Sequence, residues 1–190
     1  PPADVLPYEA YAAERKSRRT AITELKRPRR VAVGPDATFY FENYATMLHQ
    51  VQEMLHIERG GAEQLADELD AYNPLIPQGS ELVATMMFEI DDERRREREL
   101  RRLTGVETKI FMEVGDEKVM GIVPEGEIER TKADGKTSSI HFLHFPFTAA
   151  QIAKFRDPAT RVLLAIGHEN YGHMALVEGA TRASLVEDFA

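Results

Sequence analysis

The 190 residues of this sequence include six histidines, 32 acidic residues and no cysteine. Histidines and carboxylates are therefore the candidate side chains for metal binding or acid–base chemistry. The lack of cysteine excludes thiolate metal sites, iron–sulfur clusters and cysteine nucleophiles from this chain. His168 and His173 enclose four residues, a spacing typical of a hairpin loop. If they oppose each other at the base of that hairpin, their Cβ atoms lie ~4.5–5.5 Å apart and both imidazoles can bind one Zn, Fe, Cu or Ni ion. The alternative is two exposed loop histidines with no role.

A third histidine, His141, lies in a string that is typical of a strand, Ile140-His141-Phe142-Leu143-His144-Phe145. The two-residue period of a strand puts His141 on one face with Leu143 and Phe145, so we expect largely apolar surroundings. One interpretation is a core histidine that bonds a backbone carbonyl or a tyrosine. The other is a metal ligand or a general base. Two histidines and one carboxylate would leave positions open on a metal for oxygen or peroxide chemistry.

Residues 43–58 have the apolar period of a helix, and this helix also has a polar stripe. At about 100° per residue, four potential ligands lie along one line: Glu42, His49, Glu53 and His56. Carboxylate-bridged di-iron bundles use the Glu53-x-x-His56 spacing, but the sequence has no second Glu-x-x-His helix. Since the stripe lies opposite the apolar face, the alternative is a solvated face with His–Glu pairs. We expect Glu53 or Glu42 to supply the carboxylate of a metal site.

These residues must be positioned by helices and strands together. Residues 1–80 are mainly helical, with helices expected at 8–27, 43–58 and 62–71 and a short strand pair between the first two. Residues 81–190 consist mainly of strands, with short helices at 91–103, 149–156 and 181–189; the strand-like segments are 82–90, 108–114, 119–123, 139–147, 161–167 and 174–177. Hairpin connections with few crossover helices predict a single α+β domain over residues 1–190, in which an antiparallel sheet of five to seven strands packs with the N-terminal helices.

The charge is unevenly distributed. The formal net charge is −8, from 24 basic and 32 acidic residues, yet residues 1–30 carry a net charge of +4. Their basic residues are Arg15, Lys16, Arg18, Arg19, Lys26, Arg27, Arg29 and Arg30. Such a segment suits an acidic protein surface or a phosphate backbone, but no nucleic-acid motif accompanies it. No apolar run approaches the ~18–20 residues of a membrane span, and the start of the chain lacks a signal-peptide pattern, so we expect a cytoplasmic protein.

Several strings together resemble a bacterial family of proteins of unknown function. They are Phe41-Glu42-Asn43, Gln50-Val51-Gln52-Glu53-Met54-Leu55 with Glu58-Arg59, Ala71-Tyr72-Asn73-Pro74-Leu75-Ile76-Pro77, Arg130-Thr131, Lys136-Thr137-Ser138-Ser139 and Ile140-His141-Phe142-Leu143. The resemblance covers nearly the whole chain. Genes of this family often lie beside a rubrerythrin and an iron–sulfur oxidoreductase, so the resemblance implies a role in peroxide or iron-linked redox metabolism. It implies no catalytic residues.

The leading hypothesis is a cytoplasmic metal-binding protein linked to peroxide or redox metabolism, with non-haem iron or zinc as the divalent metal. Its expected ligands are His141, His168, His173 and a carboxylate, Glu53 or Glu42. The alternative is a non-catalytic accessory or scaffold protein that docks on a rubrerythrin or iron–sulfur partner through its basic N-terminal helix. Nucleic-acid binding through the same helix is the third hypothesis. The sequence leaves both catalysis and a homodimer open.

Overall fold

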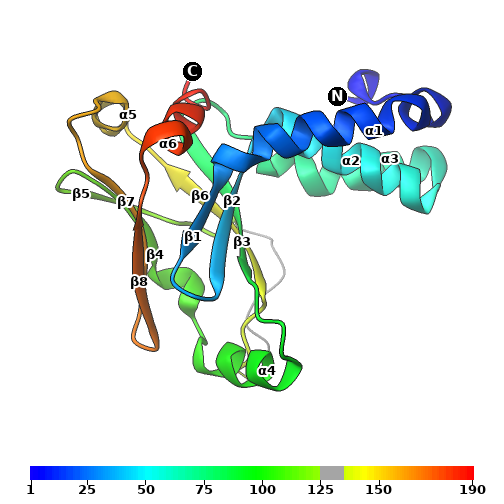
Figure 1. The fold of residues 1–190 in the computed structure, drawn as a ribbon. Coiled ribbons are helices and arrows are strands. Elements are labelled where there is room, and N and C mark those ends of the chain that lie inside the picture. Colours follow the sequence, from blue (N-terminus) through cyan, green and yellow to red (C-terminus); the bar gives the residue numbers. More distant parts are fainter. Residues whose placement is uncertain (125–134) are drawn as a thin grey trace.

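The computed structural model describes residues 1–124 and 135–190, which form eight strands in two antiparallel sheets and six α-helices (Figure 1). The Arg130-Thr131 string lies outside the described residues. The first sheet has the order β1-β2-β3-β6, with β1 at Arg30–Val33, β2 at Ala37–Glu42, β3 at Glu81–Phe88 and β6 at Ile140–Pro146. The second has the order β5-β4-β7-β8, with β4 at Ile110–Val114, β5 at Glu117–Met120, β7 at Val162–His168 and β8 at Tyr171–Leu176.

The α+β class and the antiparallel pairing are confirmed, but the prediction of one sheet with five to seven strands differs from this arrangement. The reason is that apolar alternation shows which side chains share a face and leaves open to which sheet a strand belongs. Apolar alternation therefore does not predict how the strands divide between the two sheets.

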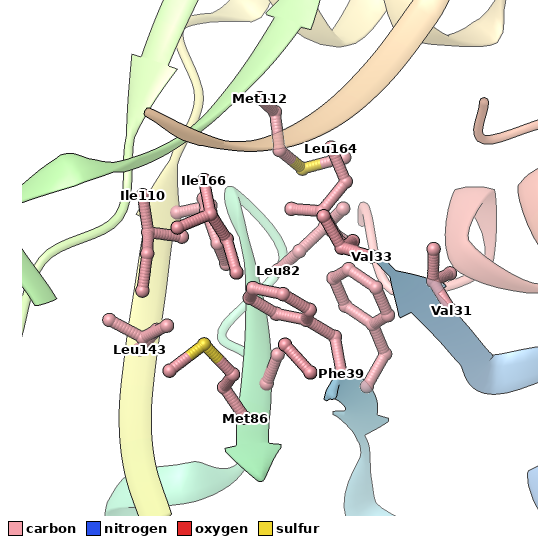
Figure 2. Close-up of a cluster of buried hydrophobic side chains, with 14 of the residues drawn as sticks. Val31, Val33, Phe39, Leu82, Met86, Ile110, Met112, Leu143, Leu164 and Ile166 are labelled. Atoms are coloured by element: carbon pink, nitrogen blue, oxygen red, sulfur yellow. The ribbon is translucent and has the colours of Figure 1, made fainter. Parts of the chain in front are cut away.

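The main core lies between the two sheets. Alternate residues of β2 and β3, such as Phe39, Leu82 and Met86, face Ile110 and Leu164 of the second sheet, and all five are fully buried (Figure 2). The same alternation turns the intervening residues of β2, β3 and β6 to the other face of the first sheet. That outer face therefore needs a cover of its own.

Helices α1 (Tyr8–Lys26), α2 (Tyr44–Glu58) and α3 (Gly61–Tyr72) form a group beside the first sheet (Figure 1). Met47 of α2, Leu75 after α3 and Val83 of β3 make a second, small apolar cluster between helices and sheet. The other helices are α4 (Glu93–Arg102), α5 (Ala149–Arg156) and α6 (Gly179–Val186). No helix of the described residues has the length and apolar character needed to cross a membrane.

Helix α2 begins where β2 ends, and a capping box fixes this junction. The Asn43 side chain accepts a hydrogen bond from the Thr46 backbone N–H, and the Thr46 hydroxyl accepts one from the Asn43 N–H. Such caps satisfy backbone donors that the first turn of a helix leaves unpaired. Glu42, the last residue of β2, is thereby held against the N-terminus of α2.

Arg29 ties this junction to the C-terminal helix. Its side chain is 1% exposed, donates to the carbonyls of Phe41, Glu42 and Ser184 at 3.0, 3.0 and 3.1 Å, and forms an ion pair with Asp188. Arg29 is therefore a structural residue of the interior. Its inclusion in a basic docking surface, as expected from the sequence, is wrong.

Candidate functional site

His141 is fully buried on β6, and its Nε2 donates to the carbonyl oxygen of Ser138 at 2.9 Å. The edge of Phe88 packs against the imidazole with ring centroids 6.3 Å apart. These contacts match the interpretation of a core histidine bonded to a backbone carbonyl. Because Nε2 carries a proton in this arrangement, that nitrogen has no lone pair for a metal.

The hairpin between β7 and β8 is tighter than the sequence predicts. His168 pairs with Tyr171, and His173 pairs with Ile166, so the loop has two residues and the prediction of four is wrong. This change of register keeps the two histidines from opposing each other. His168 donates from Nε2 to the Thr104 carbonyl at 3.2 Å and accepts at Nδ1 from the Asn170 N–H at 3.1 Å, so both of its nitrogens are used within the fold.

His173 lies beside Tyr171, with ring centroids 4.6 Å apart, and against the turn between β1 and β2. That turn is held by the Tyr171 hydroxyl, which donates to the Val33 carbonyl at 2.8 Å and accepts from the Asp36 and Ala37 N–H groups at 2.9 Å. Gly34 in the turn has φ +73°, and a Cβ there would lie 2.6 Å from the His173 ring. His173 is nevertheless exposed, so it lies at the surface of the junction between the sheets.

The polar stripe of α2 faces α1. Glu53 accepts a hydrogen bond from the Tyr11 hydroxyl at 2.6 Å and two from Arg15, each at 2.8 Å. His49 Nδ1 lies 3.5 Å from the same hydroxyl, and the His56 ring stacks on Tyr8 with centroids 5.0 Å apart. The interpretation of this stripe as a solvated face is wrong, because α1 covers it.

The Arg15 guanidinium, helped by the Tyr11 hydroxyl, lowers the pKa of Glu53 from 4.5 to about 2. Burial lowers the pKa of His49, against the opposing effect of the Glu53 charge. At neutral pH, Glu53 is therefore ionised and bonded by an arginine and a tyrosine. That arrangement is typical of a partly buried structural ion pair between helices.

The five expected metal ligands are thus distributed over different parts of the fold: Glu42 at the β2–α2 junction, Glu53 between α1 and α2, His141 on β6, and His168 and His173 on the β7–β8 hairpin. Within residues 1–124 and 135–190, no three His, Asp or Glu side chains are grouped closely enough to hold a metal ion. As placed, the expected residues do not form a three-ligand site. Metal binding and a redox role stay predictions, which the metal content of the purified protein would test.

Glu42, one of the expected site residues, lies at a cavity. It is 7% exposed, and its two carboxylate oxygens accept hydrogen bonds from the hydroxyls of Thr85, at 2.8 Å, and Thr46, at 2.6 Å. The register explains the first contact, since Glu42 pairs with Val83 and Thr85 is the diagonal neighbour on the same face. The positive end of the α2 dipole adds to the stabilisation of this carboxylate.

The cavity lies between α2, the segment after α3 and the outer face of the first sheet, and its volume is about 400 Å³. Apolar side chains line much of it, namely Met47, Leu75, Met87, Ile140 and Phe142. The polar side chains around Glu42 are those of Lys26, Tyr40, Gln50, Tyr72 and Thr85. An apolar pocket with a few convergent polar groups is the usual form of a small-molecule site.

The cavity was not predicted from the sequence, because its walls come from five separate segments. One available signal was the two-residue period of β2, which puts Tyr40 and Glu42 on the face opposite Phe39 and Phe41. Another was Thr85, a hydroxyl residue inside an apolar strand. Three strings that carry the family resemblance also supply Glu42, Gln50 and Tyr72 to this cavity.

Comparison with known proteins agrees with this resemblance. A comparison with curated proteins finds no match. A solved structure of a protein of unknown function from Burkholderia pseudomallei is 35% identical, has a TM-score of 0.89, and the match covers 98% of this chain and 96% of that one. The model of the family described as "Protein of unknown function (DUF3501)" matches residues 1–189. The chain therefore belongs to the DUF3501 family of proteins of unknown function.

Proposed function

We propose that this protein binds a small organic molecule in the cavity at Glu42, with the Glu42 carboxylate as the anchor for a positively charged group. The observation that carries the proposal is that this buried carboxylate lines a cavity while no Lys, Arg or His nitrogen of the described residues lies within 4.0 Å of it. A buried carboxylate without a cationic partner is costly, so a cationic ligand would supply the charge that the fold leaves out.

Several features favour an organic cation over a hydrated metal ion. Both carboxylate oxygens already accept a threonine hydroxyl, so the remaining lone pairs suit hydrogen bonds from an ammonium group. The ring of Tyr72 lines the same cavity and can attract a cation through its face. The methionine, leucine and isoleucine side chains suit an apolar body on that cation.

The test uses phenethylamine, which is an ammonium ion at neutral pH, and phenethyl alcohol, its uncharged counterpart. We expect the amine to bind about tenfold more tightly than the alcohol, because only the amine carries a charge for Glu42. Methyl signals of Met47 and Met87 in NMR spectra should shift in a saturable way, while those of Met174, exposed on the second sheet, should not. Glu42→Gln should remove the preference for the amine.

Two further variants make the result interpretable. Glu81→Gln changes a carboxylate on the same sheet face that bonds His144 at 2.9 Å and does not line the cavity, so it should leave binding unchanged. Ile140→Trp, at a position 37% exposed at the edge of the cavity, should block both probes without touching Glu42. Equal binding of both probes, or binding that survives Ile140→Trp, contradicts the proposal.

A second proposed function is docking on an acidic protein, such as the rubrerythrin or iron–sulfur partner that the family resemblance implies. It is favoured by Lys16 and Arg19, which are exposed on α1 and make no ion pair within the described residues. Arg15 and Arg18 are engaged by Glu53 and Glu14. The available positive charge is therefore concentrated on one face of α1.

For this docking function, Lys16→Glu combined with Arg19→Glu should weaken association with the acidic partner about tenfold at low salt and reduce its salt sensitivity. The measurement is the dissociation constant at two salt concentrations. The control is Arg27→Glu, since Arg27 already pairs with Glu24 at the end of α1. If Arg27→Glu weakens the association as much as the double variant does, protein docking through this face is wrong. It is also wrong if the wild-type protein binds RNA and the double variant does not.

A further inference from the structure

We infer that the ligand of the Glu42 cavity is a zwitterion of amino-acid size, whose ammonium group meets Glu42 and whose carboxylate meets Lys26. This inference rests on the proposed function. Its starting point is that two oppositely charged side chains line one cavity and are not paired with each other: no nitrogen of Lys26 lies within 4.0 Å of the Glu42 carboxylate.

Lys26 is the last residue of α1 and is only partly exposed. It makes no ion pair with any described residue. An ammonium group at a half-buried position beside an apolar cavity is a ready partner for an anion. By contrast, Arg30, the first residue of β1, is bound to Glu89 at 3.2 Å and lies over the Tyr40 ring. Lys26 is thus the cation left available at the cavity within the described part of the chain.

Two neutral groups can complete the recognition of a carboxylate. The Gln50 amide nitrogen donates to the Tyr72 hydroxyl at 3.4 Å, which leaves the proton of that hydroxyl for another acceptor. Both residues line the cavity with Lys26. A ligand carboxylate could therefore accept from a lysine ammonium and a tyrosine hydroxyl, a charge-assisted pair of bonds.

Size and polarity limit the remainder of the ligand. The volume of about 400 Å³ is near the lower end of the ~300–1,000 Å³ range of small-molecule pockets. Met47 and Leu75, which are 4% and 3% exposed, form a buried apolar part of the wall. An amino acid with an apolar side chain satisfies all three requirements, namely a cation, an anion and an apolar body. A dinucleotide or a strongly polar sugar does not.

The test compares three probes that share one phenyl group: phenylalanine, phenethylamine, which lacks the carboxylate, and phenylpropionate, which lacks the amine. Calorimetry should give phenylalanine an affinity about tenfold higher than phenethylamine, and phenylpropionate the weakest binding. Lys26→Met should reduce phenylalanine to the affinity of phenethylamine and leave phenethylamine itself unchanged. Lys16→Met, which removes an exposed lysine of α1 outside the cavity, is the matched control.

The outcomes separate this inference from the proposed function. If phenethylamine binds through Glu42 but phenylalanine binds no more tightly, the zwitterion is wrong and the cation site stands. If Lys26→Met leaves the advantage of phenylalanine intact, the role of Lys26 is wrong. If none of the three probes binds, both proposals fail. If Lys26→Met lowers the melting temperature, Lys26→Arg is used in its place. This variant retains the positive charge, so it should still bind phenylalanine more tightly than phenethylamine.

Discussion

Replacing Arg29 with methionine should lower the free energy of unfolding by about 3–5 kcal/mol, the usual result of breaking a buried ion pair by removing one partner. The change leaves Asp188, which is 5% exposed, without its cation. It also leaves the carbonyls of Phe41, Glu42 and Ser184 without their donor. Because one substitution removes the donor of four acceptors, the decrease in the free energy of unfolding should exceed that for a single hydrogen bond. Urea unfolding followed by circular dichroism measures it.

The neighbouring residue provides the control for this prediction. Arg30→Met removes the same charge from a side chain that is 54% exposed and pairs with Glu89 at the surface. It should change the free energy of unfolding by less than about 1 kcal/mol. If the two variants are equally stable, Arg29 does not hold the C-terminal helix to the β2–α2 junction. A second comparison is Arg29→Met with Asp188→Leu, which should recover only part of the loss, since the three carbonyls stay unpaired.

Replacing Glu53 with glutamine should lower the free energy of unfolding by about 2 kcal/mol at neutral pH. A pKa lowered from 4.5 to about 2 corresponds to ~3 kcal/mol by linkage, and we reduce that figure because Arg15 is 31% exposed and water screens the pair. Since the folded-state pKa is the lower one, the contribution is fully present above pH 4.5 and is lost as the pH falls towards about 2.

The pH dependence is what distinguishes this contact from a packing effect. The difference between the wild-type protein and Glu53→Gln should be constant above pH 4.5 and should shrink towards zero near pH 2. A packing defect would persist at all pH values. Glu14→Gln is the control, because Glu14 and its partner Arg18 are 56% and 44% exposed and should contribute little. A pH-independent difference would overturn the role assigned to the Arg15–Glu53 pair.

Local patterns gave good predictions where the elements depend on nearby residues. The helix expected at 149–156 is found at Ala149–Arg156, and the one expected at 43–58 begins one residue later, at Tyr44, because Asn43 caps it. Caps, turns and apolar periods are properties of short segments, so a single sequence contains them.

Predictions that depended on distant contacts were less successful. The polar stripe of α2 was expected to face solvent or a metal, whereas Tyr11 and Arg15 cover it from a helix about 40 positions earlier. The Glu42 cavity escaped notice for the same reason, since Thr85 and Phe142 reach it only through strand register. The prediction for the hairpin at His168 was wrong because the loop has two residues where four were expected. Apolar periodicity does not determine loop length.

The bonds of Arg29 also have a consequence for the order of folding. They join residues 155 and 159 positions apart, so they close very long loops. Contacts of such sequence separation form late, because the chain entropy must be lost before they are made. During synthesis, β2 and α2 emerge long before Ser184 and Asp188 leave the ribosome. The junction that presents Glu42 should therefore become rigid only after translation has passed residue 188, so the proposed ligand binding would be a late sign of correct folding.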